Sequence, residues 1–391
     1  MKKIRKAAVI GSGVMGGGIA AMLASAGVRT VMLDIVPPDL KDEQKSDPKA
    51  RNRIVKQGLD NVLKASPALL MHPQDADRID IGNLEDDFER LAECDWVIEV
   101  VVENLKVKKD LLQKIEMVRR PGTIVTTNTS GIPLKAMSKE LGLEFRQHFL
   151  GTHFFNPVRY MRLLEIIPGE DTLPELLKFV AEYGEKILGK GIVWAKDTPN
   201  FIGNRIGVQG IVKAMQLMRE AGLTIPAVDA VFGPVMGRPK TAMFKTADLV
   251  GLDVLAHVAR NTYEMVPDDE GRDSYVMPEF VQNMIEKNLQ GKKSQSGFYK
   301  TELTPEWQKI RKVIDPDSLT YGEYEIPTYP CLENARRAGT LPERMRAVVY
   351  GDDKLARFAW KALANNLIYA ANRILEISDT IVDIDNAMKW G

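Results

Sequence analysis

Three glycines at a fixed spacing near the N-terminus limit the folds open to this chain more than any other feature. Gly11, Gly13 and Gly16 lie between an apolar run at 4–10 and a run rich in Ala and Met at 14–26. The first run predicts a strand and the second a helix. Glycines at the turn from a strand into a helix are typical of a βαβ unit that holds a pyrophosphate at the helix N-terminus.

A carboxylate at the end of the next predicted strand, 30–34, supports this interpretation. Asp34 can accept hydrogen bonds from both hydroxyls of an adenosine ribose, and its charge would repel a 2′-phosphate. Ile35 follows it, and no arginine stands there to bind such a phosphate. The sequence therefore predicts NAD rather than NADP. The residues expected around NAD in this unit are Gly11, Gly13, Val14, Met15, Gly16 and Asp34.

Predicted strands and helices continue to alternate as far as about residue 195. The strands are 95–102, 123–127, 149–155, 162–167 and 191–194, and the helices are 105–118, 133–141 and 174–188. This alternation predicts an α/β domain over 1–195 with a Rossmann-type, doubly wound and mostly parallel sheet.

The pattern changes to helical periodicity after Pro199, and we expect an all-α domain over 196–300. Five prolines in 301–345 predict an extended connector. Glu220, Thr224-Ile225 and Asp229 recur at the same spacing as Glu376, Thr380-Ile381 and Asp385. We therefore interpret 346–391 as part of a second helical repeat, in a chain that we expect to be a piece of a longer polypeptide.

Composition excludes several classes of function. Lys plus Arg and Asp plus Glu both number 53, so no net charge favours nucleic acid or an anionic membrane. The two cysteines, Cys94 and Cys331, lack metal-ligand spacing and fit a reducing cytoplasm. Glycines interrupt the basic and apolar N-terminus, which argues against a secretory signal. No apolar stretch approaches the roughly 20 residues of a membrane span. We predict a cytoplasmic protein without a metal site.

A histidine and a carboxylate twelve residues apart form the strongest catalytic candidate. His153 ends one predicted strand, and Glu165 lies inside the next, among apolar residues. A carboxylate there is costly to bury unless it is paired. Paired with an imidazole, it would fix the tautomer of a general base. The remaining histidines, His72, His148 and His257, are expected to be ordinary core or edge residues.

Other polar residues follow predicted strands, at the sheet edge where ligands of doubly wound folds bind. Ser130 comes after strand 123–127, and Glu103-Asn104 comes after strand 95–102. Such residues are also common in ordinary turns, and that alternative stays open.

A basic segment at 41–64 holds seven cations against four acids, an excess of three positive charges. The cations are Lys41, Lys45, Lys49, Arg51, Arg53, Lys56 and Lys64. The segment is either the solvated face of an amphipathic helix or a docking face for a phosphorylated substrate handle.

Together these motifs resemble the 3-hydroxyacyl-CoA dehydrogenase family of fatty-acid β-oxidation, from residue 4 to about 300. The motifs are Gly11-Ser12-Gly13-Val14-Met15-Gly16, Val102-Glu103-Asn104-Leu105, Asn128-Thr129-Ser130, His153-Phe154-Phe155-Asn156-Pro157, Lys196-Asp197-Thr198-Pro199, Asn204-Arg205 and Ser296-Gly297-Phe298-Tyr299. The resemblance implies NAD-dependent oxidation of (S)-3-hydroxyacyl-CoA to 3-oxoacyl-CoA.

The resemblance also implies roles for individual residues. His153 would be the catalytic base, with Glu165 as its partner. Ser130 and Asn204 would lie near the 3-oxygen of the substrate. The residues implied near the NAD ribose and nicotinamide are Glu103, Lys108, Ser130 and Asn156. The basic segment would be the CoA-binding helical insertion of the family.

The motif Gly237-Arg238-Pro239-Lys240-Thr241 and the partial second repeat look like the long family members. Those members often carry a fused enoyl-CoA hydratase domain, so the resemblance implies such a domain, fused or as a partner. It also implies a homodimer, or a pseudo-dimer through the helical repeats. Two alternatives stay open: a dehydrogenase of a non-CoA hydroxy acid or sugar acid on the same scaffold, and a non-catalytic NAD-binding protein.

Overall fold

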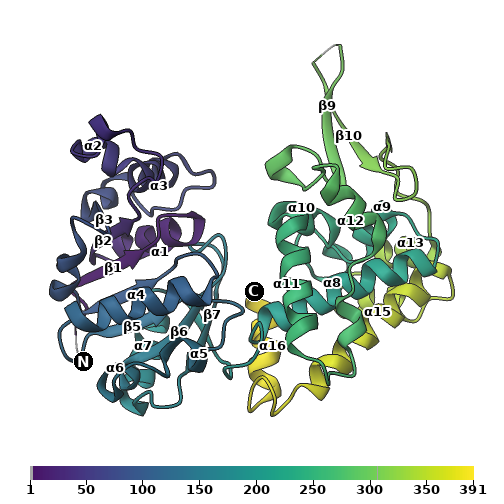
Figure 1. The fold of residues 1–391 in the computed structure, drawn as a ribbon. Helices are drawn as coiled ribbons and strands as arrows, with labels where there is room; N and C mark the ends of the chain where they lie inside the picture. The colour runs from purple at the N-terminus through teal and green to yellow at the C-terminus, as the bar shows by residue number, and fades with distance from the viewer. Residues whose placement is uncertain (1–2, 306) are drawn as a thin grey trace. The chain divides into compact units, whose positions relative to one another are not determined.

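The structure, a computed structural model, describes residues 3–305 and 307–391 (Figure 1). The chain folds into two compact units, one made of Met1–Gly203 with Arg373–Gly391, and the other of Asn204–Asn372. This division differs from the boundaries expected near residues 195, 300 and 345. The difference arises because the end of the chain returns to the first unit.

The first unit contains an eight-stranded sheet with the order β3-β2-β1-β4-β5-β6-β7-β8. The strands are β1 (Lys6–Ile10), β2 (Arg29–Asp34), β3 (Ile79–Asn83), β4 (Trp96–Glu99), β5 (Ile124–Thr127), β6 (Phe149–Phe154), β7 (Leu163–Pro168) and β8 (Gly191–Trp194). Neighbouring strands are parallel except for β6 and β7, which are antiparallel. The expected doubly wound and mostly parallel sheet is confirmed.

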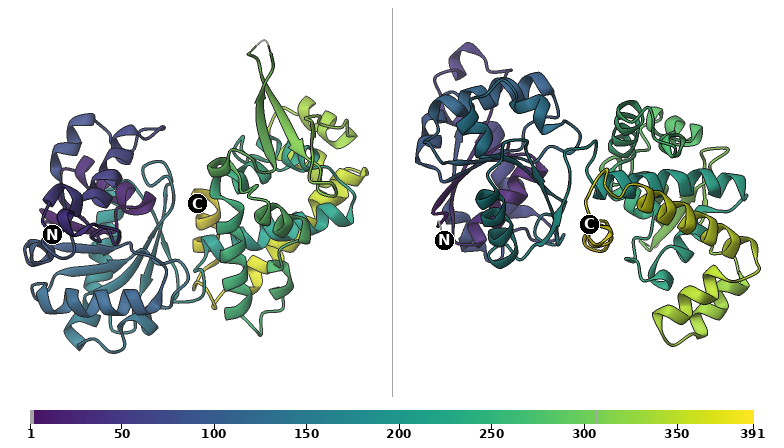
Figure 2. Two further views of the ribbon diagram at one scale, coloured as in Figure 1. Left: turned by 45° about the horizontal axis from the view of Figure 1, so that its top comes forward. Right: turned by 90° about the horizontal axis from the view of Figure 1, so that it is seen from below.

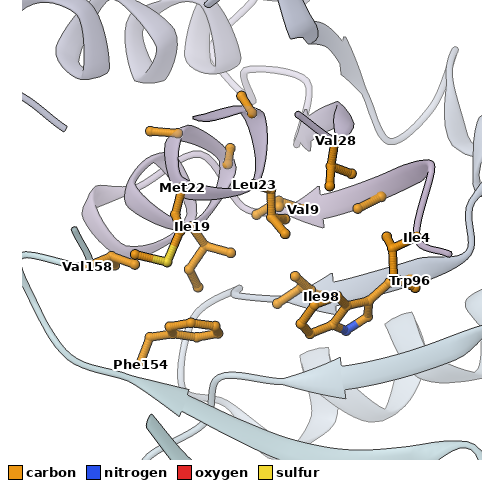
Figure 3. Packing of buried hydrophobic residues seen from close by; sticks show 14 of the residues in the cluster. Ile4, Val9, Ile19, Met22, Leu23, Val28, Trp96, Ile98, Phe154 and Val158 are labelled. Atoms are coloured by element: carbon orange, nitrogen blue, oxygen red, sulfur yellow. The ribbon is translucent and has the colours of Figure 1, made fainter. Parts of the chain in front are cut away.

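Helices cover both faces of this sheet (Figures 1 and 2). They include α1 (Val14–Ser25), α4 (Leu105–Val118), α5 (Leu134–Ser138), α6 (Leu143–Gln147) and α7 (Pro174–Lys186). The main apolar cluster joins α1 and α7 to one face of the sheet, with Ile19 and Leu23 of α1 packed over Val9 and Ile98 (Figure 3). Burying each such side chain contributes about 1.5–3 kcal/mol, so this cluster fixes α1 against β1.

An insertion after β2 contains α2 (Pro48–Arg51) and α3 (Arg53–Lys64), followed by strand β3. The sequence predicted the helical part of this insertion but not β3. The strand lies at the edge of the sheet and pairs on one side only, with β2. Its sequence, IDIGN, carries two polar residues and a glycine, so its apolar alternation is too short to stand out.

The second unit is mainly helical. Its helices are α8 (Gly203–Glu220), α9 (Ile225–Val231), α10 (Phe244–Val250), α11 (Leu252–Met265), α12 (Glu279–Glu286), α13 (Pro330–Arg337), α14 (Leu341–Val349) and α15 (Lys354–Asn372). It also holds a small antiparallel sheet of β9 (Tyr299–Leu303), β10 (Lys309–Ile314) and β11 (Tyr321–Glu323). The hairpin of β9 and β10 projects from this unit (Figure 2).

Ordered elements therefore occupy much of the segment 301–345, where an extended connector was expected. Two of its prolines lie in the first turns of α13 and α14, at Pro330 and Pro342. A proline is tolerated there because the first N–H groups of a helix have no intrahelical acceptor. Proline content alone therefore gave a misleading prediction for this segment.

The structure shows the internal repeat as two matching helix pairs. Helix α8 is followed by α9, and later in the chain α15 is followed by α16 (Ile381–Trp390). Thr224 caps α9 by accepting the N–H of Ala227, and Thr380 caps α16 by accepting the N–H of Asp383. The repeated Thr-Ile pair therefore marks a helix start in both copies.

Within the second unit, α8 and α15 contact each other through equivalent positions. The Gln209 amide donates to Asn365 Oδ1 at 2.8 Å, and the Asn366 amide donates to Gln209 Oε1 at 3.0 Å. Nearby, the buried Arg205 guanidinium lies 2.6 Å from Asp269 and donates to the Tyr369 hydroxyl at 2.7 Å. These polar contacts fix the register of the two helices.

Helix α16 belongs to the first unit and packs on the edge strand β8. A Cβ atom on Gly191 would lie 2.3 Å from the Trp390 ring, so the glycine makes room for this aromatic side chain. The Arg162 guanidinium lies 4.6 Å from the centroid of the same ring. None of the helices in the described ranges is long and apolar enough to cross a bilayer.

Candidate active site

The crossover point of the sheet lies between β1 and β4. The chain leaves β1 toward β2 on one side and leaves β4 toward β5 on the other. Ligands of doubly wound sheets bind outside the carboxyl ends of the strands at such a point. Gly11 follows β1 there, and Glu99 ends β4 there, with Ile10 and Glu99 in register.

The geometry around the glycine-rich turn fits a bound dinucleotide. Gly11 has a φ of 106°, and a Cβ there would lie 2.5 Å from Val100 O. A Cβ on Gly16 would lie 1.8 Å from Gly11 O, so only glycine allows α1 to pack this closely. Gly13 faces open space within 4 Å and no side chain caps α1 there. Gly13 and the first N–H groups of α1, at Val14 and Met15, could therefore hold a pyrophosphate.

The Asp34 carboxylate lies beside this turn and is already hydrogen-bonded. Its Oδ2 accepts the backbone N–H of Ser12 at 2.6 Å and the Ser12 hydroxyl at 2.5 Å. Its Oδ1 accepts the N–H of Ile35 at 2.7 Å. The sequence prediction missed Ser12, although a hydroxyl between the first two glycines of the motif was the signal available.

A buried ion pair lies at the carboxyl end of β4. Lys108 is 1% exposed, and its Nζ lies 2.8 Å and 3.0 Å from the two carboxylate oxygens of Glu99. Glu99 also accepts the Thr127 hydroxyl at 2.5 Å and the N–H of Val101 at 2.7 Å. Lys108 was predicted to lie near NAD, and that role stays a prediction. Glu99 was missed, although it is a carboxylate within an apolar strand.

Glu103 connects this ion pair to the loop after β5. Its Oε2 lies 3.3 Å from Lys108 Nζ, and its Oε1 accepts the Thr129 hydroxyl and the N–H groups of Ser130 (3.0 Å) and Gly131 (2.9 Å). Burial acts to raise the pKa of Glu103, but the Lys108 charge and these hydrogen bonds hold it below its usual value. Two predicted residues, Glu103 and Ser130, are thus brought into direct contact.

His153 and Glu165 face each other across β6 and β7, as predicted. They are direct register partners, and His153 Nδ1 lies 2.6 Å from Glu165 Oε2. Glu165 is fully buried, and its Oε1 accepts the N–H groups of Ile202 (3.0 Å) and Gly203 (2.7 Å). With Nδ1–H directed at the carboxylate, the hydrogen-bond geometry leaves His153 Nε2 as a proton acceptor.

Aromatic rings enclose the imidazole. The Phe155 and Phe201 rings have centroids 4.4 Å and 5.6 Å from that of His153. The Asn128 side chain, after β5, accepts the N–H of Phe154 at 2.8 Å and so ties the two strand ends together. These contacts hold the histidine in one orientation, as catalysis by a general base requires.

Two further predicted site residues are the asparagines Asn156 and Asn204. Asn156 is exposed and lies three residues after His153. Asn204 directly follows Gly203, whose N–H is held by Glu165, and is the first residue of the second unit. Their expected contacts with NAD and with the substrate stay predictions.

The structure shows which cations of the basic insertion are already paired with carboxylates and which could bind a phosphate. Several are already paired: Lys45 with Asp42, Arg51 with Glu85 and Asp86, Arg53 with Asp39, and Lys56 with Asp60. Lys41, Lys49 and Lys64 are exposed and make no ion pair within the part of the chain that the structure describes. Elsewhere in the same part, no cluster of His, Cys, Asp and Glu could hold a metal ion.

Comparison with known families agrees with this geometry. Residues 6–198 match the model of the 3-hydroxyacyl-CoA dehydrogenase NAD-binding domain, and residues 201–301 match that of the C-terminal domain of the same family. A probable 3-hydroxyacyl-CoA dehydrogenase from Deinococcus radiodurans is 47% identical over 298 residues, which cover 76% of this chain and 83% of that protein.

The chain belongs to the 3-hydroxyacyl-CoA dehydrogenase family.

Because the first matched domain is the NAD-binding domain of the family, the predicted cofactor is confirmed as NAD. A probable 3-hydroxyacyl-CoA dehydrogenase from Bacillus subtilis is 48% identical over the whole chain. The present chain spans about half, 49%, of the length of that Bacillus subtilis relative.

Solved structures of the family have the same fold. The structure of M. tuberculosis FadB2 aligns with a TM-score of 0.63 at 27% identity, covering 76% of this chain and 99% of that one. The (S)-3-hydroxybutyryl-CoA dehydrogenase of Ralstonia eutropha aligns with a TM-score of 0.58 at 27% identity, covering 75% of this chain and 98% of that one.

Proposed function

We propose that this family member catalyses NAD-dependent oxidation of (S)-3-hydroxyacyl-CoA to 3-oxoacyl-CoA in fatty-acid oxidation. The observation that carries the proposal is the buried His153–Glu165 pair, with its 2.6 Å contact, in the family's NAD-binding domain. A histidine with one nitrogen held by a carboxylate is suited to take a proton from an alcohol.

In the proposed reaction, His153 Nε2 takes the proton of the C3 hydroxyl while the hydride leaves C3. NAD, when bound, supplies the acceptor for that hydride. Glu165 stabilises the imidazolium that forms, because its Oε2 already lies 2.6 Å from Nδ1. General-base catalysis of this kind contributes about 10²–10⁴-fold to the rate.

Ser130 and Asn204 are proposed to hold the substrate oxygen for this transfer. The Ser130 backbone is fixed by Glu103, which is itself held by Lys108. The Glu99–Lys108–Glu103 network is therefore proposed to hold the loop that carries Ser130, with Lys108 acting as a positioning residue. Fixing a reacting group in this way lowers the entropic part of the barrier.

The CoA handle is proposed to bind the insertion. Lys41, Lys49 and Lys64 are exposed and free of ion pairs in the described ranges, so they can contact phosphates without breaking an ion pair. Two Rickettsia relatives, 34–35% identical over the chain, are named putative fatty acid oxidation complex trifunctional enzymes. That name supports the proposed role in fatty-acid oxidation, and a hydratase-type partner or fused domain.

The test is NADH formation with (S)-3-hydroxyacyl-CoA thioesters of graded chain length, beside the matching free (S)-3-hydroxy acids. We expect turnover with the thioesters and little with the free acids. Turnover of free acids at equal kcat/KM would contradict a CoA-specific site. Tight NAD binding without turnover of any substrate would indicate a non-catalytic NAD-binding protein.

A further inference from the structure

The insertion helix α3 lies directly on the glycine-rich turn. A Cβ atom on Gly58 of α3 would lie 2.5 Å from Ser12 O and 2.7 Å from Ser12 Oγ. One turn further along, Val62 packs on Gly17 of α1, where a Cβ would lie 2.9 Å from its methyl group. Only a glycine at 58 allows α3 to approach the turn this closely, so the insertion and the turn form one packed unit.

Ser12, the residue beneath Gly58, is buried, with 5% of its surface exposed. Its N–H and its hydroxyl both donate to Asp34 Oδ2, and the N–H of Ile35 donates to Oδ1. A carboxylate oxygen has about two acceptor positions. Ser12 therefore fills those of Oδ2, and the N–H of Ile35 fills one of the two on Oδ1, so one acceptor position of Oδ1 is left for a ribose hydroxyl.

The insertion also holds the strand beside Asp34. Asp34 is the register partner of Asn83, whose side-chain amide donates to Asn52 Oδ1 at 3.0 Å. Arg51 Nε donates to Asp86 at 2.7 Å, just after that strand. Asp34 thus lies between two contacts of the insertion, one through Ser12 and one through Asn83.

We propose that Ser12, held in place by its close packing against Gly58, is a positioning residue that orients the Asp34 carboxylate toward the adenosine ribose. Through this orientation Ser12 sets both the affinity for NAD and the preference for NAD over NADP. The inference rests on the proposed NAD-dependent function and on the predicted recognition of the ribose by Asp34. Ser12 does not touch the reacting atoms, so its loss should act on cofactor binding and leave the chemical step intact. The insertion thereby contributes to the cofactor site as well as to the proposed CoA site.

The first experiment compares Ser12→Ala with the wild-type chain by calorimetric titration of NAD and by steady-state kinetics with both cofactors. A hydrogen bond to a charged group contributes about 1.5–3 kcal/mol, which corresponds to about 10–100-fold in affinity. We expect about tenfold weaker NAD binding, a similar rise in KM for NAD, and kcat within about twofold. The selectivity for NAD over NADP should fall by about tenfold.

A second variant, Gly58→Ala, leaves the Ser12 hydroxyl intact, but the added Cβ atom clashes with Ser12 and should displace it. It should reproduce the rise in KM for NAD at nearly unchanged kcat. Ser138→Ala, which removes a buried hydroxyl bonded to Leu134 O, and Gly207→Ala, with open space in α8, serve as matched controls. Thermal unfolding of each variant confirms that the comparison is made on folded protein.

The variant Asp34→Ala distinguishes ribose recognition by Asp34 from the positioning role of Ser12. If Asp34→Ala leaves NAD binding unchanged, ribose recognition by Asp34 is wrong, and the inference fails with it. If Asp34→Ala weakens NAD binding but Ser12→Ala binds NAD as the wild type does, or more tightly, only the role of Ser12 is overturned. A fall in kcat at unchanged KM in Ser12→Ala would also contradict a positioning role in cofactor binding.

Discussion

The His153 imidazole and the Glu165 carboxylate meet across two antiparallel strands, with Nδ1 and Oε2 2.6 Å apart. The second carboxylate oxygen accepts two backbone N–H groups from the segment that begins α8. Both oxygens of the Glu165 carboxylate are therefore held by hydrogen bonds, and the carboxylate can fix the direction of the imidazole. The first two predictions depend on this arrangement.

Replacing the histidine should remove the proton acceptor while leaving cofactor binding intact. His153→Gln is expected to lower kcat by about 10²–10⁴-fold, the contribution of a positioned general base. The dissociation constant for NAD should change by less than about threefold, because the glycine-rich turn is untouched. The measurements are NADH formation and NAD titration, with the exposed His257→Gln as control. Near-normal turnover of His153→Gln would refute the assignment.

Replacing the carboxylate by its amide should reverse the tautomer of the imidazole. In Glu165→Gln, the amide oxygen can still accept the N–H groups of Ile202 and Gly203, so the amide nitrogen would donate to Nδ1. Nε2 would then carry the proton and could not accept another. We expect kcat to fall by about 10²–10⁴-fold with a changed pH–rate profile. Glu182→Gln on the surface of α7 is the control, and an unchanged profile in Glu165→Gln would argue against the orienting role.

Breaking the buried ion pair should destabilise the first unit. Lys108→Met leaves the fully buried Glu99 without its ammonium partner, which typically costs about 3–5 kcal/mol. Denaturant unfolding measures the loss. Lys109→Met, on the same helix, removes only an exposed pair with Glu140 and should have little effect. Equal stability of the two variants would show that the Glu99–Lys108 pair contributes nothing to the fold.

The unpaired lysines of the insertion should act on substrate binding alone. A triple change of Lys41, Lys49 and Lys64 to Gln is expected to raise KM for acyl-CoA by about tenfold, with kcat nearly constant. The effect should shrink at high salt, because exposed charges are screened. A control triple change uses the exposed Lys139, Lys178 and Lys287. An identical KM in both triple variants would move the CoA site away from the insertion.

Asp248 should make the stability of the helical unit depend on pH. Burial raises the pKa of Asp248 from 3.8 to about 6, against the backbone N–H groups of Tyr299 and Phe298 that hydrogen-bond to it, and the nearby Asp229 charge adds to the rise. A raised pKa means that the protonated form is favoured in the fold. The stability it contributes is full below about pH 4 and is lost as the pH rises through 6.

The matching experiment compares thermal and denaturant unfolding of wild type and Asp248→Asn between pH 4.5 and 7.5. The stability advantage of the wild type over this variant should shrink by about 2 kcal/mol across that range, since one pKa unit corresponds to about 1.4 kcal/mol and the range from pH 4.5 to the raised pKa of about 6 covers about 1.5 units. The exposed Asp268→Asn controls for a general effect of charge. A difference that stays constant with pH would contradict the raised pKa.

Local patterns in the sequence were enough to predict the sheet, except for its edge strand β3, and the His153–Glu165 pair. The apolar runs around both residues are long, and the fixed period of a strand places them opposite each other. The serine between Gly11 and Gly13 was visible in the sequence, but its contacts with Asp34 and Gly58 could not be predicted, because they depend on how closely β2 and α3 approach the glycine-rich turn. Glu99 was missed for a related reason: its partner Lys108 lies on the following helix, and only the packed fold encloses both.

The contact between Gln209 and Asn365 has a consequence for how this chain can change. The two residues hold the same place in the two helical copies and bond to each other. In a symmetric dimer, a residue on the two-fold axis contacts the same residue of the other subunit. The contact between Gln209 and Asn365 is the equivalent of such a contact within one polypeptide. Joined copies are no longer bound to be identical, and a Gln now faces an Asn. Further substitutions at either site must suit the other, so these two positions are expected to vary together among relatives.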